Sequence, residues 1–255
     1  MTRLSTGLKA AGLALILLSP PAVAAALPKA AAPAKTVVLA AVRKGVVLTL
    51  TADGKPVARF TNSAAFNWNE LGSVVIKTAA GPRPVFMLSP NYPEPEDSDQ
   101  AGDQPNYLFD ETGRLFWVIE GQFNPAKSVL LESQHETFSV GDYKASFDLE
   151  DFSRTPHLKF VFKSNCYADE WVSDTELKAH CPRTTANGEV VETDAVVRQV
   201  SPTQWRLTEK ALPKAKLKVA PDNPATLFNE LATGVRAKPE VQTLPDDLAA
   251  TYKRF

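Results

Sequence analysis

The sequence has little cysteine, histidine and glycine, and no charge of one sign dominates it. Its 255 residues include two cysteines, three histidines and twelve glycines, and the formal net charge is −1. Three histidines leave few side chains that act as acid and base near neutral pH. A net charge close to zero is unlike the strongly positive charge that is typical of a nucleic-acid-binding protein, so we expect no nucleic-acid partner.

The motifs of several enzyme classes are missing as well. The chain has no GxSxG nucleophile elbow, no HExxH zinc motif, no SxxK and no glycine-rich phosphate loop. His135, His157 and His180 lack obvious catalytic neighbours in the sequence, and a lone histidine in a β protein is usually a surface residue. The sequence therefore favours a protein that is not an enzyme.

The one long apolar run lies at the amino terminus. A basic start is followed by the apolar run Ala10–Leu18 and by Ala22-Val23-Ala24, a pattern that signal peptidase accepts. The run is too short to cross a bilayer, which takes about 20 residues. We expect residues 1–24 to be a secretory signal peptide and residues 25–35 an Ala/Pro-rich tether. The mature protein is then soluble, periplasmic or secreted, and without a membrane span.

Alternation of apolar and polar residues dominates from residue 36 onward. Leu48 and Leu50 lie on one face of a predicted strand, with Thr49 on the other. Asp53-Gly54 follows this run and predicts a tight hairpin, because glycine accepts the positive φ of the turn. About ten such short strands predict a mainly β fold over residues 36–213, an antiparallel β-sandwich or a partly closed barrel.

Helical signals are few. Ala168–Ala179 is predicted as one short helix. Asn223-Pro224 resembles a helix cap followed by a first helical residue, and predicts a helix as far as about Ala232. Leu244–Tyr252 is a third short candidate. We therefore expect residues 214–255 to form a C-terminal extension that is helical or irregular.

The two cysteines are expected to form a disulfide. Cys166 and Cys181 are the only pair in a chain that carries an export signal, and exported proteins mature in oxidising compartments. Closing a loop of this length stabilises a fold by about 3 kcal/mol. The bond would staple the helix predicted between the two cysteines as a flap between two strands.

An acidic, proline-rich stretch between predicted strands is a candidate calcium site. Asp97, Asp99 and Asp103, with a glycine between them, match the start of a calcium loop, where oxygen ligands precede a sharp turn. Ala101 and Leu108 stand at later positions that need oxygen ligands. The open alternative is a solvated surface loop. Calcium is the only cofactor that the sequence suggests.

The best carboxylate pair for catalysis is Asp148 and Glu150. Two residues apart on a predicted strand, they share one face, and carboxylate pairs perform glycoside hydrolysis on β folds. Phe147 and Leu149 alternate with them, so the charged face is equally well explained as the solvent side of a sheet.

Three aromatic residues are candidate ligand contacts. Trp171 lies on the predicted flap, and Tyr92 and Tyr107 flank the acidic stretch. Together these features predict an exported β-rich protein that binds an unknown ligand or protein of the cell envelope without catalysing a reaction. The alternatives are a carbohydrate-active hydrolase that uses Asp148 and Glu150, and a calcium-stabilised structural module.

Overall fold

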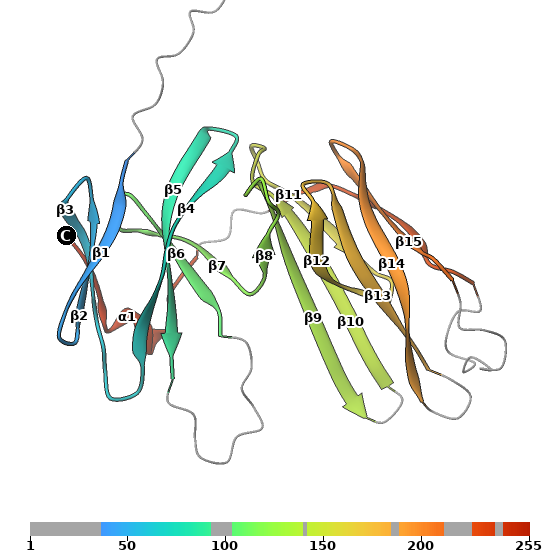
Figure 1. Cartoon of the computed structure of the whole chain (residues 1–255), viewed down its shortest axis with the longest axis horizontal. Helices are drawn as coiled ribbons and strands as arrows, with labels where there is room; N and C mark the ends of the chain where they lie inside the picture. The colour runs from blue at the N-terminus through green and yellow to red at the C-terminus, as the bar shows by residue number, and fades with distance from the viewer. Residues whose placement is uncertain (1–36, 93–103, 140–141, 185–188, 212–225, 238–241) are drawn as a thin grey trace, which may run out of the picture. The chain divides into compact units, whose positions relative to one another are not determined.

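Four antiparallel sheets make up the part of the chain that the structure describes. The computed structural model describes residues 37–92, 104–139, 142–184, 189–211, 226–237 and 242–255 (Figure 1), all within the unit Thr36–Phe255. The predicted signal peptide and tether lie outside the described residues. Asp97, Asp99 and Asp103 of the predicted calcium site also lie outside them.

Sheets A and B have four strands each. Sheet A has the order β1-β2-β3-β18, with β1 (Leu39–Lys44), β2 (Val47–Ala52), β3 (Lys55–Thr61) and β18 (Tyr252–Arg254). Sheet B has the order β4-β5-β6-β7, with β4 (Asn67–Thr78), β5 (Gly81–Asn91), β6 (Asn106–Asp110) and β7 (Leu115–Ile119). The two sheets share one apolar core and therefore form a first sandwich.

Sheets C and D have five strands each and share a second core. Sheet C has the order β17-β11-β10-β9-β8, with β17 (Val235–Arg236), β11 (Leu158–Phe162), β10 (Asp142–Asp151), β9 (Val129–Ser139) and β8 (Gln122–Phe123). Sheet D has the order β12-β13-β14-β15-β16, with β12 (Tyr167–Ser173), β13 (Glu176–Thr184), β14 (Val190–Ser201), β15 (Gln204–Glu209) and β16 (Asn229–Thr233). These sheets form a second sandwich, and the predicted antiparallel β fold is confirmed.

The alternation read from the sequence directs side chains into these cores. Leu48 and Leu50 of β2 are fully buried, whereas Thr49 between them is half-buried. Asp53 and Gly54, which join β2 to β3, have φ values of 48° and 76°. Positive φ at both central residues is the geometry of the tight hairpin turn, so the predicted hairpin is confirmed.

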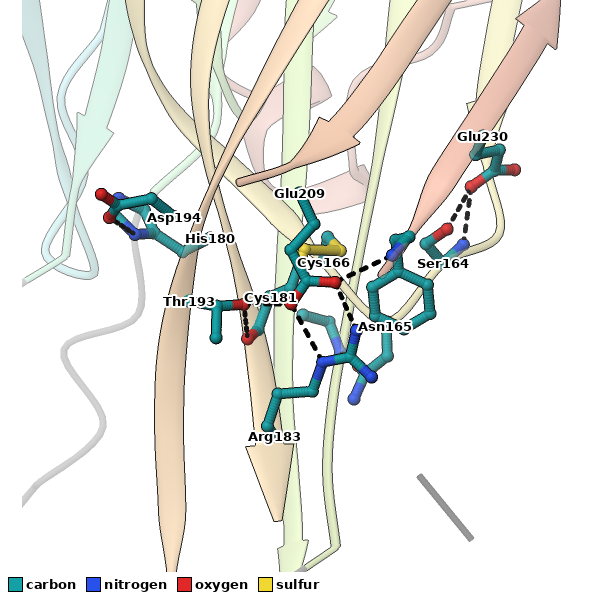
Figure 2. The surroundings of a disulfide bond; sticks show 12 residues. Ser164, Asn165, Cys166, His180, Cys181, Arg183, Thr193, Asp194, Glu209 and Glu230 are labelled. Carbon is teal, nitrogen blue, oxygen red and sulfur yellow. Dashed lines mark hydrogen bonds and ion pairs between the residues drawn. A yellow bond between two sulfur atoms is a disulfide. The ribbon is translucent and has the colours of Figure 1, made fainter. Parts of the chain in front are cut away.

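The predicted helix at Ala168–Ala179 is wrong, because this segment forms β12, a turn and β13. Leu177, Ala179 and Cys181 alternate into the second core, which is the period of a strand. The predicted disulfide is confirmed: Cys166 and Cys181 are bonded, with Cα atoms 4.1 Å apart (Figure 2). It therefore links the residue just before β12 to β13 of the same hairpin, and not the ends of a helix.

The segment after residue 214 adds strands to three of the sheets. The helix predicted to end near Ala232 is wrong in its described part, because β16 pairs there with β15. β17 pairs with β11, and β18 pairs with β3. Helical structure is confined to the four-residue helix α1 (Asp246–Ala249) within the described residues, inside the predicted range Leu244–Tyr252.

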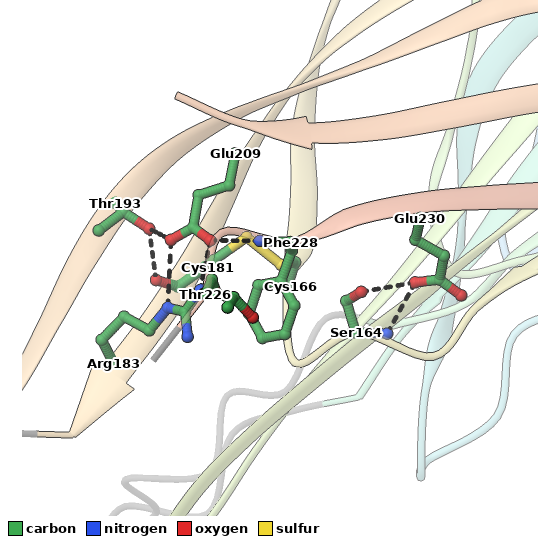
Figure 3. A network of polar contacts seen from close by, with 9 residues as sticks. All are labelled: Ser164, Cys166, Cys181, Arg183, Thr193, Glu209, Thr226, Phe228 and Glu230. Carbon is green, nitrogen blue, oxygen red and sulfur yellow. Dashed lines mark hydrogen bonds and ion pairs between the residues drawn. A yellow bond between two sulfur atoms is a disulfide. The ribbon is translucent and has the colours of Figure 1, made fainter. Parts of the chain in front are cut away.

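A buried ion pair lies beside the disulfide in the second sandwich (Figure 3). The guanidinium of Arg183 donates to Glu209, with Nε and Oε1 3.1 Å apart, and both side chains are almost completely buried. The backbone N–H of Phe228 donates to Glu209 at 2.8 Å, and the Phe228 ring lies 4.0 Å from the guanidinium carbon. Thr193 donates to Glu209 and to the carbonyl of Cys181.

Replacing only one member of this pair should destabilise the protein strongly. Glu209→Gln leaves the Arg183 charge buried without its counter-charge, so we expect the free energy of unfolding to fall by about 3–5 kcal/mol. The double variant R183M/E209L removes both charges and should recover most of that loss. Urea denaturation measures both. Glu176→Gln, in an exposed pair with Arg198, is the control and should have little effect. Equal losses for the single and double variants would contradict this account.

Candidate functional site

Asp148 and Glu150 lie on the outer face of sheet C, and that face is partly covered. Phe147 and Leu149 point into the second core, as the alternation predicts. Glu150 nevertheless keeps only 7% of its surface exposed. The cover comes from sheet B, because an apolar cluster joins residues of the two sheets. Its members are Ile76, Val85, Leu108 and Ile119 of sheet B, Leu130 of β9, and Phe152, which follows β10.

Two adjoining cavities lie beside this apolar cluster. The inner one has a volume of about 180 Å³ and is lined by Trp117, Val118, Glu120, Glu132, Ser133, Glu150, Lys159 and Gln242. The outer one, of about 360 Å³, shares Glu120 and Ser133 with it and adds Gln104, Asn106, Gly121, Gln122, Leu131, Ala168 and Asp169. We call the two together the acidic groove.

Strand register brings the charged residues of the acidic groove together. Glu132 of β9 lies opposite Asp148 of β10, and Glu150 lies opposite Lys159 of β11. The Lys159 ammonium is 2.9 Å from a carboxylate oxygen of Asp148. Burial alone would lower the pKa of Lys159. The hydrogen bond and charge of Asp148, together with the charges of Glu150 and Glu132, raise that pKa above its usual value.

Carboxylates predominate among the described residues that line the acidic groove. Among the residues that the structure describes, the lining contains the carboxylates of Glu120, Glu132, Glu150 and Asp169 and the ammonium of Lys159. Lys159 is moreover engaged by Asp148, which does not line either cavity. An excess of one sign between low-dielectric walls concentrates the electric field and attracts ligands of the opposite charge.

Hydrogen bonds fix several lining segments in position. The Gln242 side chain accepts from the backbone N–H of Val118 at 3.2 Å. Gln122 donates through its side chain to the backbone of Asp169 and accepts, through its backbone carbonyl, from the Trp171 indole at 3.1 Å. These bonds tie segments before β9 to the C-terminal segment and to sheet D, so the lining is largely preformed.

Two further features shape the groove at β9. A Cβ atom at Gly121 would lie 1.7 Å from the carbonyl oxygen of Leu131, so only glycine allows the chain to pass this close to the strand. The hydroxyl oxygen of Ser133 is shielded from solvent and has no hydrogen-bond partner among the described residues. A shielded hydroxyl that lines a cavity can be satisfied by a ligand or by water.

The structure does not bring the three candidate aromatic residues together. Trp171 packs against Trp205 of the second core, with ring centroids 6.0 Å apart, and reaches the groove only through Gln122. Tyr107 is 3% exposed in the first core. Tyr92 packs at the edge of that core, where burial, with the hydrogen bond to and charge of Asp247, raises its pKa to about 12. Their role in ligand binding stays a prediction.

Trp117 is the aromatic residue that lines the acidic groove, and the sequence analysis did not select it. Its ring packs edge-on against Phe152, with centroids 5.1 Å apart, and lies 5.7 Å from the ring of His157. Burial lowers the pKa of His157, and the charge of Asp151 only partly opposes this. Trp117 is therefore packed against the apolar cluster and half-buried, and it also lines the cavity.

Other polar clusters are less suited to ligand binding. A cavity of about 490 Å³, lined by Lys77 of β4 and by residues of the second sandwich, has two cations, Lys77 and Arg154, and two carboxylates, Asp151 and Asp174, among its described lining residues. Asp151 accepts from Arg154 at 3.2 Å, and Asp174 accepts from the backbone N–H of Ala126 at 2.6 Å. Among the described residues, no group of three or more histidines, cysteines or carboxylates could hold a metal ion, and no helix is long and apolar enough to cross a membrane.

Lys159→Met should destabilise the protein in a pH-dependent way. At pH 7 we expect a loss of about 1–2 kcal/mol, because Asp148, Glu132 and Glu150 lose the half-buried cation between them. The carboxylates then repel one another and resist ionisation, so the loss should shrink toward pH 4.5, where they take up protons. Because the pKa of Lys159 is raised from 10.5, its own contribution is complete at both pH values and is lost only as the pH rises through that raised pKa.

Urea denaturation at pH 7 and pH 4.5 measures this effect. Lys163→Met, at an exposed position just after β11, is the matched control and should change stability little at either pH. An equal loss for Lys159→Met at both pH values would show that packing of its aliphatic chain, and not its charge, stabilises the fold.

Comparison with other proteins leaves this site as the main evidence for function. No family model matches the chain, and no curated protein or solved structure matches it either. A β-sandwich serves many unrelated functions, so the fold alone does not identify one. The function has to be inferred from the groove, its charges and its aromatic residue.

Proposed function

We propose that this protein is an exported β-rich module of the cell envelope that binds a ligand or a segment of another protein in the acidic groove, without catalysing a reaction. The observation that carries this proposal is the buried Glu150 in a preformed cavity that is also lined by the half-buried Trp117. Ligand sites are concave, combine apolar surface with a few converging polar groups, and are usually preformed.

Two observations support export to the periplasm or beyond the cell. The amino-terminal run Ala10–Leu18 and the small residues after it have the pattern of a cleaved signal peptide. The disulfide Cys166–Cys181 lies in the second core, and disulfides persist in oxidising compartments. The disulfide is consistent with an extracellular location, and the choice between periplasm and medium belongs to the proposal.

A thermal-melt screen of the mature protein, from Ala25, tests the binding function. The panel contains cell-wall and other oligosaccharides, calcium, a chelator and linear amines. A ligand at about 100 times its Kd stabilises the folded state by about 2.7 kcal/mol, which raises the Tm of a domain of this size by roughly 5–10 °C. A fall in Tm with chelator would instead support the calcium-stabilised module centred on Asp97, Asp99 and Asp103.

Charge-reversal variants show whether any such ligand uses the acidic groove. E120K/D169K changes two exposed groove residues and should abolish the shift in Tm. E70K/D246K makes the same change of net charge at two exposed residues outside the groove, and should leave the shift intact. A shift that survives in E120K/D169K would place the ligand elsewhere on the protein and contradict the proposal.

A second candidate function is glycoside hydrolysis. It is favoured by one observation: Glu150 and Glu132 line the same cavity as Trp117, and glycosidases use a carboxylate pair together with a surface on which a sugar ring can pack. The pair suggested by the sequence was Asp148 and Glu150. Because Asp148 is paired with Lys159 and does not line the cavity, Glu132 takes its role in this mechanism.

Release of reducing sugar from the oligosaccharide panel tests this second function. If the protein is a hydrolase, Glu150→Gln should lower the rate by about a thousandfold or more while leaving substrate binding largely intact. Asp148→Asn should retain most of the activity. No release by the wild-type protein, or full activity in Glu150→Gln, would exclude hydrolysis at this site.

A further inference from the structure

We infer that His157 makes the contact between sheets B and C sensitive to acid, so that this contact loosens when the imidazole takes up a proton. The inference goes beyond the proposed binding function and does not depend on it. It rests on the place of His157 in the contact, on backbone hydrogen bonds that cross the same contact, and on the charged groups around the ring.

His157 lies at the apolar cluster that joins sheets B and C. Its ring centroid is 4.6 Å from that of Phe152, which is fully buried, and 5.7 Å from that of Trp117 in β7. Phe152 belongs to the cluster from the side of sheet C, and Trp117 packs against the cluster from sheet B. The imidazole therefore packs against side chains from both sides of the contact.

Two backbone hydrogen bonds cross the same contact. The N–H of Lys77 in β4 donates to the carbonyl of Lys127 at 2.8 Å, and the N–H of Ala79, just after β4, donates to the carbonyl of Phe152 at 3.0 Å. The two acceptor residues lie just before β9 and just after β10, so both belong to the second sandwich. Because the ring of Phe152 lies against His157, a change at the imidazole acts beside one of these bonds.

The surroundings of His157 favour a neutral imidazole. Burial lowers the pKa of His157 from its ordinary value of 6.5, and the charge of Asp151 only partly opposes this. Asp151 is also bound by Arg154, whose Nε lies 3.2 Å from a carboxylate oxygen. An imidazolium at this place would thus lose water and gain little from its nearest carboxylate.

The other elements around the ring add little negative charge. β7 contains no charged residue. Lys159 of β11 binds Asp148, and Arg236 of β17 is exposed opposite Leu158. Both are cations, which do not stabilise a second positive charge. The N–H of Ala237 donates to the carbonyl of His157, and the residues that follow it, Lys238 and Glu240 among them, lie outside the described residues.

Preference for the neutral imidazole makes the contact weaker in acid. Where the contact is open, His157 is in water and takes up a proton near pH 6.5, whereas in the closed contact it does so only at lower pH. Protons therefore favour the open form as the pH falls below 6.5, and the stabilisation by neutral His157 is complete above that pH. Trp117 and Val118 line the inner cavity together with residues of sheet C, so this cavity would open with the contact.

Hydrogen exchange of single backbone amides, followed by NMR at pH 7.5 and pH 5.5, tests the inference on the mature protein. We expect protection of the Lys77 and Ala79 amides, corrected for the intrinsic exchange rate, to fall toward pH 5.5. The fall can reach about tenfold, which is the limit for a group whose pKa is 6.5 in the open form. The amides of Leu50 and Val197, within the two cores, should keep their protection.

Variants at His157 separate its titration from other effects of acid. His157→Asn cannot take up a proton in this range and should remove the pH dependence at Lys77 and Ala79. His157→Phe keeps an aromatic ring and repeats the test if His157→Asn does not fold. His180→Asn, on sheet D, is the control and should retain the pH dependence of the wild-type protein.

Four results would overturn the inference. Protection that is the same at both pH values would show that neutral His157 does not stabilise the contact. An equal fall in a folded His157 variant would assign the effect to other groups, and an equal fall at Leu50 and Val197 would show that acid destabilises the whole protein. A rise of protection in acid would show that the neighbouring aromatic rings stabilise the imidazolium through cation–π contact, which is the opposite sign.

Discussion

Sheet C is covered by other parts of the protein on both faces. The charged residues of its outer face are therefore partly buried, and the candidate site depends on their burial. Its inner face contributes Phe147 and Leu149 to the core of the second sandwich. Its outer face carries charged residues, yet Leu130 of that face and Phe152, which follows β10, pack against sheet B. Carboxylates at the edge of this contact are therefore shielded from water, although their surroundings are not fully apolar. Among the described residues of the inner cavity, Lys159 is the cation that lies beside these carboxylates, and Asp148 also binds it.

Most of the fold could be predicted because its signals are local. Alternation of period two identifies strands such as β2, and Asp53-Gly54 specifies a turn through its own backbone preference. The hairpin of β12 and β13 was mistaken for a helix, although Leu177, Ala179 and Cys181 alternate toward the core. The polar residues of this segment are also compatible with a helix. Pairing of β13 with β14 selects the strand and not the helix.

The site was less predictable, because its residues meet through register and tertiary contact. The shared face of Asp148 and Glu150 follows from alternation along one strand. That Glu132 lies opposite Asp148, and Lys159 opposite Glu150, depends on strand pairings that no single segment specifies. Trp117 joins them only because sheet B packs on sheet C. A sequence pattern can therefore indicate a charged face without showing whether water or another sheet covers it.

The molecule buries charge in two different ways, and the contrast indicates which of them serves function. Glu209 accepts hydrogen bonds from Arg183, Thr193 and the backbone of Phe228, and the pair is sealed from solvent. A ligand could reach such a pair only by unfolding its surroundings, so its effect is on stability and packing. In the acidic groove the described charged residues line a cavity that is open to a ligand. Access to a ligand, and not the burial of charge alone, therefore distinguishes a candidate recognition site from a structural ion pair.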